Sequence, residues 1–375
     1  MDLLRITDTA TWLPDLSILD YTSLIWTERF LDFGEFELKT PNVNLLRTQL
    51  PLNSFVTLLN SREVMIVENH TIKTDSDGNS ELTISGRSFD SILENKIIRG
   101  SYQNPTKTAT VMTPCSFLTV YIWNELANTT GVDAFRPWIN PDKSVENVIP
   151  NFGVVARFSG NQPTQYWWVE DGPMSKQVRD VMLASKLGLR TSRPAPQSDG
   201  VMYMAVYTGN NRTAWQTELA PVVFSHSFGN LESPSYLHSQ KDYKNIAFLD
   251  CKLGSLEVYA NPDDIIMTGI NRRTLYVDGS DMINNTDQTF DQLLPALEQK
   301  AKQELAKYNR QFLFDVSLTD DGPYNYGVDY DLGDFVTLRA EFGLEYTMRV
   351  TEYVRTEDLE GQKAYPTLTQ EVPGA

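Results

Sequence analysis

The sequence is poor in cysteine and has no long hydrophobic run, and each shortage excludes a class of protein. Its 375 residues include two cysteines, Cys115 and Cys251, which are far apart and form no CxxC pair. Neither a disulfide framework nor a zinc ribbon is expected, and free thiols indicate folding in a reducing compartment. The opening residues, MDLLRITDTATW, lack the basic and then apolar pattern of a secretory signal. No apolar run approaches the roughly 18 residues of a spanning helix, so no membrane-spanning segment is predicted.

Basic residues are outnumbered by acidic ones. The 32 Lys and Arg residues stand against 49 Asp and Glu residues, which gives a net charge of −17. Because duplex binding needs Lys and Arg to neutralise phosphates, a surface of this sign repels nucleic acid. A specific DNA-binding function is therefore disfavoured.

Sequence motifs for catalysis and for metal binding are also lacking. The three histidines, His70, His226 and His238, form no HExxH pattern, and no GxSxG, GxxxxGK[ST] or GxGxxG motif occurs. Polar or half-buried structural histidines are the default interpretation. Neither cysteine has a histidine partner by motif. We therefore predict that the protein has no cofactor and no metal, and that it is not an enzyme.

A calcium loop and a pair of catalytic carboxylates are harder to exclude from the sequence. Residues 75–80 have the oxygens of a calcium loop, but the sixth residue is Ser80 and the twelfth is Arg87, where such a loop has Gly and Glu. A hairpin turn is the preferred interpretation. Among 49 carboxylates, some pair will lie at the separation used by glycosidases by chance. Glu170-Asp171 and Asp320-Asp321 are such candidates, and both fit turns equally well.

Aromatic residues are plentiful and accompany β-branched residues in short runs, which favours strands. Strands are expected in two groups, over 21–26, 33–38, 55–59, 63–67 and 82–85, and over 201–207, 221–228, 246–250, 256–260, 273–278 and parts of 311–370. Pro41 ends the second of them. Asp75-Ser76-Asp77-Gly78-Asn79 predicts a hairpin turn before the fifth.

Helices are expected over 116–127, 172–187 and 287–309. Gly172-Pro173 opens the second helix and Gly188 follows its end, the usual asymmetry of helix termini. In the third helix apolar residues recur every three or four positions, at Phe290, Leu294, Leu297, Ala301, Leu305 and Tyr308. Pro295 falls inside it, and either kinks the helix or marks its true start one turn later.

The end of the sequence repeats part of its beginning. Phe55-Val56-Thr57-Leu58 recurs as 335–338, Met65-Ile66-Val67 aligns with 348–350, and Asp75-Ser76-Asp77-Gly78 aligns with 358–361. The offset is 280 residues for the first pair and 283 for the others (335 − 55 and 348 − 65). Two similar β-barrel-like units would let a trimer present six quasi-equivalent units. Chance alignment of two antiparallel domains is the competing interpretation.

Landmarks along nearly the whole chain carry a family resemblance. They are WTERF at 26–30 with GEFEL at 34–38, LTISGRS at 82–88, VYTG at 206–209, Arg212-Thr213, VFS at 223–225, GNL at 229–231, YKN at 243–245, 272–278, and DYDLGDFV at 329–336. The sequence resembles minor tail proteins of long-tailed siphophages, of the tail-tip or baseplate hub type, related to the N-terminal hub region of tail-associated lysins. The motif positions expected to serve the fold are Trp26, Gly34, Phe36, Gly86, Arg87, Arg212, Phe224, Asn230, Asp331, Gly333 and Asp334.

The resemblance implies an α+β, mainly β, hub-type fold in four parts. Two similar β-barrel-like tube domains would occupy 1–104 and 201–250 with 310–375. Two peripheral domains would decorate the tube, an α+β domain over 105–200 and a strand-plus-helix domain over 251–309. Related hubs often continue into a lytic or fibre-carrying segment; none is seen in this sequence, so such activity is expected on another polypeptide.

The resemblance further implies a structural role at the tail tip of the virion, in a protein made in the host cytoplasm. A homotrimer would cap the tail tube below the ring of distal tail protein, with the C-terminal end of the tape-measure protein inside it. Fibre, spike or receptor-binding proteins would attach below it. Genomic DNA would pass through the channel without specific binding, to which a negatively charged surface is suited.

Two other functions stay open from the residues. A tail-associated cell-wall hydrolase would need a cleft with convergent carboxylates or a zinc triad. A receptor- or carbohydrate-binding tail module would use exposed aromatics such as Trp138, Trp167 and Trp168. For Trp167 and Trp168, buried core or subunit contact is the preferred interpretation.

Overall fold

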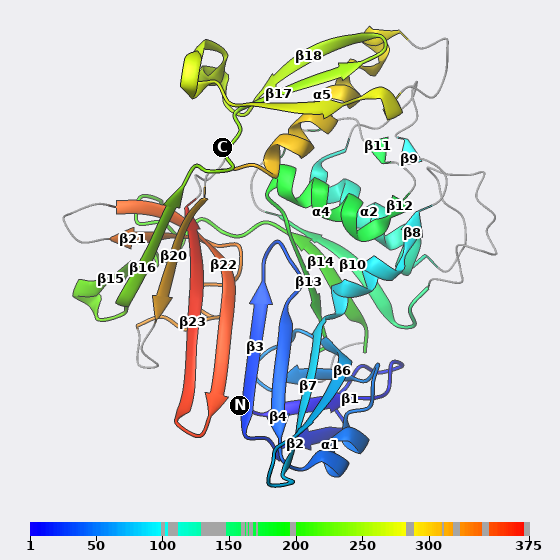
Figure 1. The fold of residues 1–375 in the computed structure, drawn as a ribbon, viewed down its shortest axis with the longest axis vertical. Helices are drawn as coiled ribbons and strands as arrows, with labels where there is room; N and C mark the ends of the chain where they lie inside the picture. Colours follow the sequence, from blue (N-terminus) through cyan, green and yellow to red (C-terminus); the bar gives the residue numbers. More distant parts are fainter. Residues whose placement is uncertain are drawn as a thin grey trace.

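The computed structural model describes residues 1–98, 102–103, 112–128, 148–158, 162, 164, 168–169, 172–195, 200–282, 289–309, 311–317, 323–339 and 345–370. Over these residues the protein is mainly β with few helices, as predicted (Figure 1). No helix among them is long and apolar enough to cross a membrane.

Strands follow one another along most of the chain, and four α-helices are interspersed among them in the described residues. The strands are β1 (Leu3–Ile6), β2 (Leu16–Ile18), β3 (Ser23–Arg29), β4 (Glu35–Thr40), β5 (Phe55–Leu58), β6 (Met65–Thr74), β7 (Ser80–Ser88), β8 (Ile97–Ile98), β9 (Tyr102–Gln103), β10 (Phe152–Arg157), β11 (Trp168–Val169), β12 (Gly172–Pro173), β13 (Gly188–Ser192), β14 (Met202–Tyr207), β15 (Val223–Ser225), β16 (Glu232–Ser239), β17 (Ile246–Cys251), β18 (Gly254–Tyr259), β19 (Thr274–Asp278), β20 (Gln311–Ser317), β21 (Phe335–Arg339), β22 (Glu345–Asp358) and β23 (Gly361–Gln370). The α-helices are α1 (Val43–Gln49), α2 (Pro114–Leu126), α4 (Met174–Ser185) and α5 (Phe290–Ala306).

One large sheet joins the two ends of the chain. Its order is β16-β20-β23-β22-β3-β4-β7-β6-β5-β1-β2, with β21 and β15 attached at β22. We call β3–β7 the N-terminal unit, and β16 with β20–β23 the C-terminal unit. Their junction is the antiparallel pairing of β22 with β3, from Glu352↔Arg29 to Glu357↔Leu24. The five strands β23, β22, β3, β4 and β7 run side by side across this junction (Figure 1).

The repeat seen in the sequence has the same strand register in both units. Phe55 and Val56 pair with Ile66 and Met65, as Phe335 and Val336 pair with Arg349 and Met348. The following hairpins are β6–β7 and β22–β23, and both are antiparallel.

Each of these two hairpins contains a β-bulge, and the two bulges lie at equivalent positions. The register shifts between Val67 and Asn69 in β6 and between Val350 and Glu352 in β22, which are equivalent positions at an offset of 283. Because a β-bulge is a specific local feature, chance alignment of two unrelated hairpins does not account for the match. Closure of either unit into a barrel stays a prediction.

The units differ at one outer strand. In the N-terminal unit β5 pairs antiparallel with β1, whereas in the C-terminal unit β21 pairs parallel with β15. The duplication therefore covers β3–β7 against β16 and β20–β23, and it does not extend to β1 and β2.

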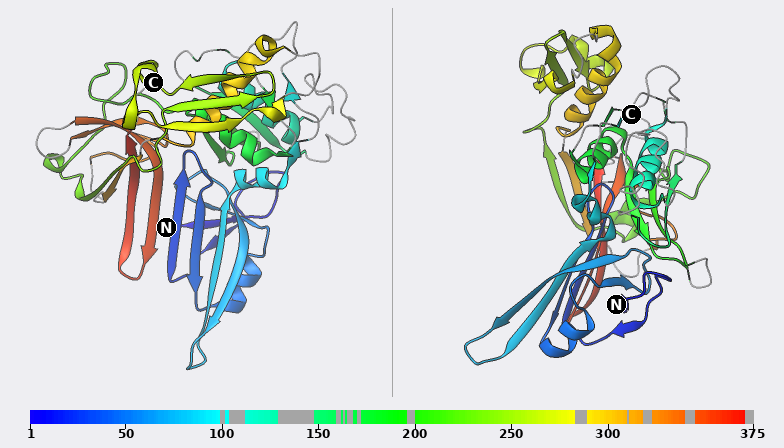
Figure 2. Two further views of the ribbon diagram at one scale, coloured as in Figure 1. Left: turned by 45° about the horizontal axis from the view of Figure 1, so that its top comes forward. Right: turned by 90° about the vertical axis from the view of Figure 1, so that its right-hand side faces the viewer.

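Two smaller modules lie beside the large sheet (Figures 1 and 2). The first peripheral module is the sheet β10-β14-β13 with helices α2 and α4. The second is the sheet β18-β17-β19 with helix α5, which packs Leu293, Leu297, Ala301 and Leu305 against it. Helices α4 and α5 contact each other, so the modules are neighbours.

Two predicted domain boundaries need correction. Strand β14 pairs with β10 and β13, so it belongs to the first peripheral module and not to a second tube domain beginning at 201. Strand β17 pairs with β18 and β19, so the second module already includes Ile246 and does not begin at 251. An apolar strand can be recognised in the sequence, but its pairing partner cannot. The four-part division itself stays a prediction.

Most predicted elements are present with shifted ends. Helices predicted at 116–127, 172–187 and 287–309 are α2, α4 and α5, and Pro295 lies within α5, whose first residue is Phe290. Leu293, rather than the predicted Leu294, is buried on its inner face. Helix α1, which follows Pro41, has no counterpart in the sequence prediction.

The hairpin turn at residues 75–79 is confirmed. Asp75 accepts backbone N–H bonds from Asp77 and Asn79 on its carboxylate, and Gly78 has φ +85°. The Asp75 oxygens are thus occupied by the turn itself, which is the hydrogen bonding expected of an Asx turn.

Candidate functional site

A buried carboxylate lies at the junction of the two units. In β3 the alternation of a strand places Leu24, Trp26 and Glu28 on the same face of the sheet, and all three are 0% exposed. Burying a charged carboxylate is costly unless the charge is paired and hydrogen-bonded. The surroundings of Glu28 therefore decide whether this junction is stable.

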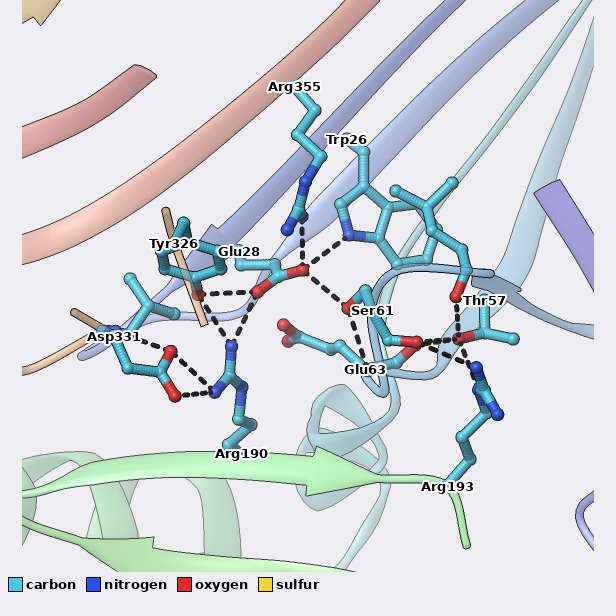
Figure 3. Close-up of polar contacts among 12 residues, drawn as sticks. Trp26, Glu28, Thr57, Ser61, Glu63, Arg190, Arg193, Tyr326, Asp331 and Arg355 are labelled. Atoms are coloured by element: carbon cyan, nitrogen blue, oxygen red, sulfur yellow. Dashed lines mark hydrogen bonds and ion pairs between the residues drawn. The ribbon is translucent and has the colours of Figure 1, made fainter. Parts of the chain in front are cut away.

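Five side chains donate hydrogen bonds to Glu28 (Figure 3). Its Oε1 accepts from Arg355 Nη1 at 2.7 Å, Ser61 Oγ at 2.7 Å and Trp26 Nε1 at 3.2 Å. Its Oε2 accepts from Arg190 Nη2 at 2.7 Å and Tyr326 OH at 2.8 Å. Burial alone would raise the pKa of Glu28, but the charges of Arg355 and Arg190 and these hydrogen bonds lower it to about 2. Glu28 is thus ionised at neutral pH.

The donors come from separate parts of the chain. Arg355 lies in β22 opposite Trp26, and Arg190 lies in β13 of the first peripheral module. Arg190 Nη1 also binds both carboxylate oxygens of Asp331 at 2.9 Å. We call Glu28, Arg190, Tyr326, Asp331 and Arg355 the junction network. It ties the N-terminal unit, the C-terminal unit and the first peripheral module together.

Aromatic rings enclose one side of this network. Tyr326 stacks on Tyr353 with ring centroids 3.8 Å apart, and the Arg355 guanidinium carbon lies 5.2 Å and 4.7 Å from the two centroids. Cation–π contacts of this kind strengthen when the cation is desolvated. The position of Arg355 is therefore held by a carboxylate and by rings together.

A second buried carboxylate nearby has no such support. Glu63 is 4% exposed, and its Oε2 has no hydrogen-bond partner among the described residues. Burial and the negative charge of Glu28 raise the pKa of Glu63 well above its ordinary value, although Arg190 acts in the opposite direction. Glu63 therefore holds a proton more readily than an exposed glutamate.

The network borders a cleft with a volume of about 610 Å³. Its charged lining residues are Glu28, Arg62, Arg157, Arg190, Asp331, Asp334 and Arg355. The three acidic groups are bound to arginines, with Glu28 and Asp331 as above and Asp334 bound by Arg212 Nε at 3.0 Å. A carboxylate held in place by an arginine, as each of these is, is poorly placed to exchange a proton with a substrate. No group of three His, Cys, Asp or Glu residues that could hold a metal occurs in the described part of the chain.

Several predicted motif residues lie in or beside strands β3, β4 and β7. Trp26 and Phe36 are buried neighbours with ring centroids 6.1 Å apart. Gly34 and Gly86 lie where a side chain would collide with backbone, since an added Cβ would come 2.7 Å from Thr27 O and 1.7 Å from Ile66 O respectively.

Arg87 follows Gly86 in β7 but has different surroundings. It is paired with Glu68 at 2.8 Å and with Glu94 at 2.7 Å, and its side chain is 38% exposed. It belongs to a surface ion cluster and not to the junction network.

The motif at 329–336 contains three further predicted motif residues, Asp331, Gly333 and Asp334. Asp331 joins the junction network, and Asp334 accepts from the Asn210 backbone N–H at 2.7 Å as well as from Arg212. Gly333 has φ +85°, and a Cβ there would lie 2.5 Å from the Phe30 ring. This motif therefore bends the chain so that its two aspartates face two different arginines.

Phe224 and Asn230 hold the start of the C-terminal unit. Phe224 is fully buried against Tyr330, and Asn230 bridges the backbone of Val223 and Ser225. Neither is among the residues that line the cleft. A common functional role for the eleven motif residues stays a prediction, since the structure brings only part of them together.

Sequence reasoning missed Glu63, Arg190, Tyr326 and Arg355 as members of one site. Glu28 was noticed only as part of a family motif. A signal for it existed, because the period-two pattern of β3 sets a charged residue on the face of Leu24 and Trp26. No local signal connects Arg190 and Arg355 to it, since they are far away in the chain.

Several candidates of the sequence analysis lie outside the described residues. They are Trp138, Trp167, Glu170, Asp171, Asp320 and Asp321. Trp168 lies in β11 and His238 in β16, as backbone positions.

Comparisons with known proteins show which family this chain matches. A family model described as Siphovirus ReqiPepy6 Gp37-like protein matches residues 3–368. No curated protein matches the sequence.

Three solved structures similar to this chain are tail proteins. The tail protein from Neisseria meningitidis MC58 has a TM-score of 0.53 at 14% identity, over 99% of this chain and 96% of that one. The prophage MuSo2 43 kDa tail protein from Shewanella oneidensis has a TM-score of 0.54 at 12% identity, over 99% and 98%. Prophage tail protein gp18 from Listeria monocytogenes EGD-e has a TM-score of 0.50 at 11% identity, over 100% and 96%. At these identities the likeness shows the fold, which is that of phage tail proteins.

Proposed function

The chain belongs to the family of Siphovirus ReqiPepy6 Gp37-like proteins and is a phage tail protein, and on this premise we propose that it forms the trimeric hub at the tail tip. In this role the protein is structural and not an enzyme. It caps the tail tube below the ring of distal tail protein and opens for DNA ejection.

The observation that carries the proposal is the duplicated unit with its coinciding bulge. Three copies of a chain with two equivalent units supply six units. A closed cyclic trimer can therefore match a ring of six subunits, and closed symmetry is the usual form of soluble oligomers. The C-terminal end of the tape-measure protein occupies the channel until ejection, and fibre, spike or receptor-binding proteins attach below.

The junction network gives the hub a fixed joint between its units. Glu28 and Arg355 hold β3 against β22, and Arg190 extends the hold to the first peripheral module. A displacement of that module, after receptor binding elsewhere on the tip, pulls on Arg190 and through it on both units. The connection from Arg190 through Glu28 to Arg355 supports the proposal that movement of the peripheral module is transmitted to the wall of the channel.

The channel wall is expected to be acidic. A net charge of −17 disfavours adsorption of the passing genome. A trimer whose lumen is strongly basic would contradict this part of the proposal.

Mass measurement with the partner ring tests the function. The purified full chain is analysed by light scattering alone and with the distal tail protein of the same phage. Three copies per six-membered ring are expected. Six copies per ring, or no binding to it, would contradict the hub.

Two further assays test the alternative roles. Clearing of purified cell wall in a zymogram would indicate a hydrolase. Adsorption of the isolated chain to host cells would indicate a receptor-binding module.

A further inference from the structure

The large sheet has several strand edges that are unpaired within the described chain, among them the outer edges of β2 and β15. Two others, on β16 and β6, are equivalent to strands that pair inside the chain. Strand β16 ends the sheet and pairs only with β20. Strand β6 pairs with β7 along its length, but β5 covers only Met65 and Ile66 on its other side. Asn53 and Ser54 also bond the backbone of Val67, and the His70 ring contacts Leu50 O at 2.8 Å. Residues 69–74 of β6 have no strand partner on that side, and all of them are exposed or half-buried. Such edges are templates for pairing with another strand.

The equivalent edge of the C-terminal unit is covered. Strand β22 corresponds to β6 at an offset of 283, so Glu352–Glu357 correspond to 69–74. In the chain, Glu352–Glu357 pair with Leu24–Arg29 of β3. Strand β22 of the C-terminal unit thus has a strand partner on this edge, β3, and the equivalent edge of β6 in the N-terminal unit has none among the described residues.

The missing partner can be identified by following the pairings across each unit. In the N-terminal unit, Gly86 of β7 pairs with Val67 of β6 and with Phe36 of β4. In the C-terminal unit, Leu368 of β23 pairs with Val350 of β22 and with Phe314 of β20. Because Val350 is equivalent to Val67, Phe314 of β20 is equivalent to Phe36 of β4. Phe36 faces Trp26 in β3, and Phe314 faces Tyr236 in β16. Strand β16 is therefore the equivalent of β3, at an offset of 210.

We propose that β6 of one copy pairs antiparallel with β16 of the next copy, repeating between chains the junction that β22 and β3 make within the chain. Residues 69–73 face 235–239 in reverse order, and Thr71 lies opposite Leu237. The occupant of each bare edge is a second copy of this chain, because each copy offers both halves of the junction. This inference rests on the proposed hub and adds its subunit interface.

The hydrogen-bond pattern agrees with an open ladder at β6. Phe30 N–H donates to Thr351 O at 2.9 Å, so Phe30 and Thr351 form a hydrogen-bonded pair. These pairs alternate along antiparallel strands. By equivalence, His70 and Ile72 of β6 direct their backbone groups to the neighbouring copy, while Thr71 and Lys73 direct theirs to β7.

An independent bond gives the same alternation. Ser88 N–H donates to Gly34 O at 2.9 Å, which directs the even residues of β7 to β4 and the odd residues, including Thr83 opposite Thr71, to β6. The two apolar side chains on these edges, Ile72 and Leu237, are 46% and 48% exposed. The register shift between Glu232 and Ser235 contains Pro234, which sets the end of the pairing, since proline cannot donate to a ladder.

Cross-strand cysteines test the register. The full chain carries Thr71→Cys with Leu237→Cys, and Cys251→Ser in every variant removes the accessible native thiol. Thr71 and Leu237 form a non-hydrogen-bonded pair in the proposed ladder, in which side chains are closest. Oxidation in complex with the distal-tail ring is expected to link chains into covalent trimers.

Matched pairs control this result. Ile25→Cys with Thr356→Cys has the same pairing class within one chain and should close without changing the mass. Lys73→Cys with Leu237→Cys is displaced by two residues and should link roughly tenfold more slowly, because disulfide geometry is strict.

The outcomes separate the interface from the function. A trimer by mass that fails to link at 71 and 237, or that links equally at 73 and 237, overturns the interface and leaves the hub. Absence of any trimer overturns both.

A proline pair provides a second test. Ile72→Pro removes an N–H that points away from β7, so the fold should persist while trimer formation falls at least tenfold in affinity. Thr71→Pro removes an N–H that the hairpin itself uses, so it should lower the melting temperature instead. If Ile72→Pro leaves assembly unchanged, the proposed ladder is wrong.

Discussion

The N-terminal and C-terminal units share strands, register and bulge, yet they differ in what their equivalent positions contain. At the inner junction Glu28 and Arg355 form a buried ion pair at 2.7 Å. The equivalent positions at the proposed outer junction are His238 and Ile72, so no such pair recurs there. Removing one partner of a buried ion pair leaves an uncompensated buried charge, so such a pair disfavours separation of the strands that carry it. The two units therefore share their backbone pairing, while a buried ion pair is found at the inner junction alone of these two sets of equivalent positions.

Breaking the inner junction should have the largest effect. In Glu28→Ala, the buried Arg355 and the half-buried Arg190 lose their shared carboxylate, and breaking the buried Glu28–Arg355 pair costs about 3–5 kcal/mol. Denaturant unfolding of the variant measures the loss. Glu37→Gln, on a side chain that is 43% exposed in the adjacent strand, is the control and should change stability by less than about 0.5 kcal/mol. Equal effects of the two changes would show that the junction network is not what holds the units together.

The second comparison concerns the bulge. Gly86 is opposite Val67 in the N-terminal unit, and Leu368 is opposite Val350 in the other. Gly86→Ala places a Cβ 1.7 Å from Ile66 O, so the backbone must shift, at a cost of about 2–4 kcal/mol. Gly78→Ala, in the exposed turn of the same hairpin with φ +85° and open space, should cost about 1 kcal/mol. Similar melting temperatures for the two variants would contradict this assignment.

A third change tests Glu63, the buried carboxylate whose Oε2 has no hydrogen-bond partner among the described residues. Because the folded-state pKa of Glu63 lies above its ordinary value of 4.5, the native state binds the proton more tightly, and stability falls as pH rises above about 4.5. Glu63→Gln keeps the shape and removes the ionisation. The variant should match the wild type near pH 4 and melt roughly 2 °C higher at pH 7.

Glu28 should respond to pH in the opposite sense. Its folded-state pKa of about 2 is below the ordinary 4.5, so its contribution is complete above about pH 4.5 and disappears as pH falls toward 2. Calorimetry from pH 3 to pH 8 on the wild type and Glu63→Gln separates the two groups. A wild-type slope that Glu63→Gln leaves intact at neutral pH would show that Glu63 is not its source.

The smallest effect is expected between the peripheral modules. Lys307 Nζ lies 3.1 Å from Asp180 and links α5 to α4, but both side chains keep some contact with solvent, at 27% and 13% exposed. Partly exposed ion pairs contribute about 0–1 kcal/mol. Lys307→Met should therefore shift the melting temperature by about 1 °C or less, and a shift as large as that of Gly86→Ala would show that the modules depend on each other.

The sequence alone determined the local elements and one long-range fact. Runs rich in aromatic and β-branched residues predicted β3 and β4, the Asp75–Asn79 turn predicted the β6–β7 hairpin, and apolar spacing predicted α5. The repeated FVTL and its partner segments predicted two related units, because equal spacing preserves strand register. These signals are readable since each depends on neighbouring residues or on two copies of one pattern.

Only the tertiary structure decided how these elements are joined. The pairing of β22 with β3, the transfer of β14 and β17 to the peripheral modules, and the meeting of Glu28 with Arg190 and Arg355 all bring distant residues together. Strand pairing and ion pairing are set by packing in three dimensions, and many partners for an apolar strand or a glutamate are equally acceptable in one dimension. For this reason the sequence could supply the duplicated parts of the protein, while the junction between them exists only in the folded chain.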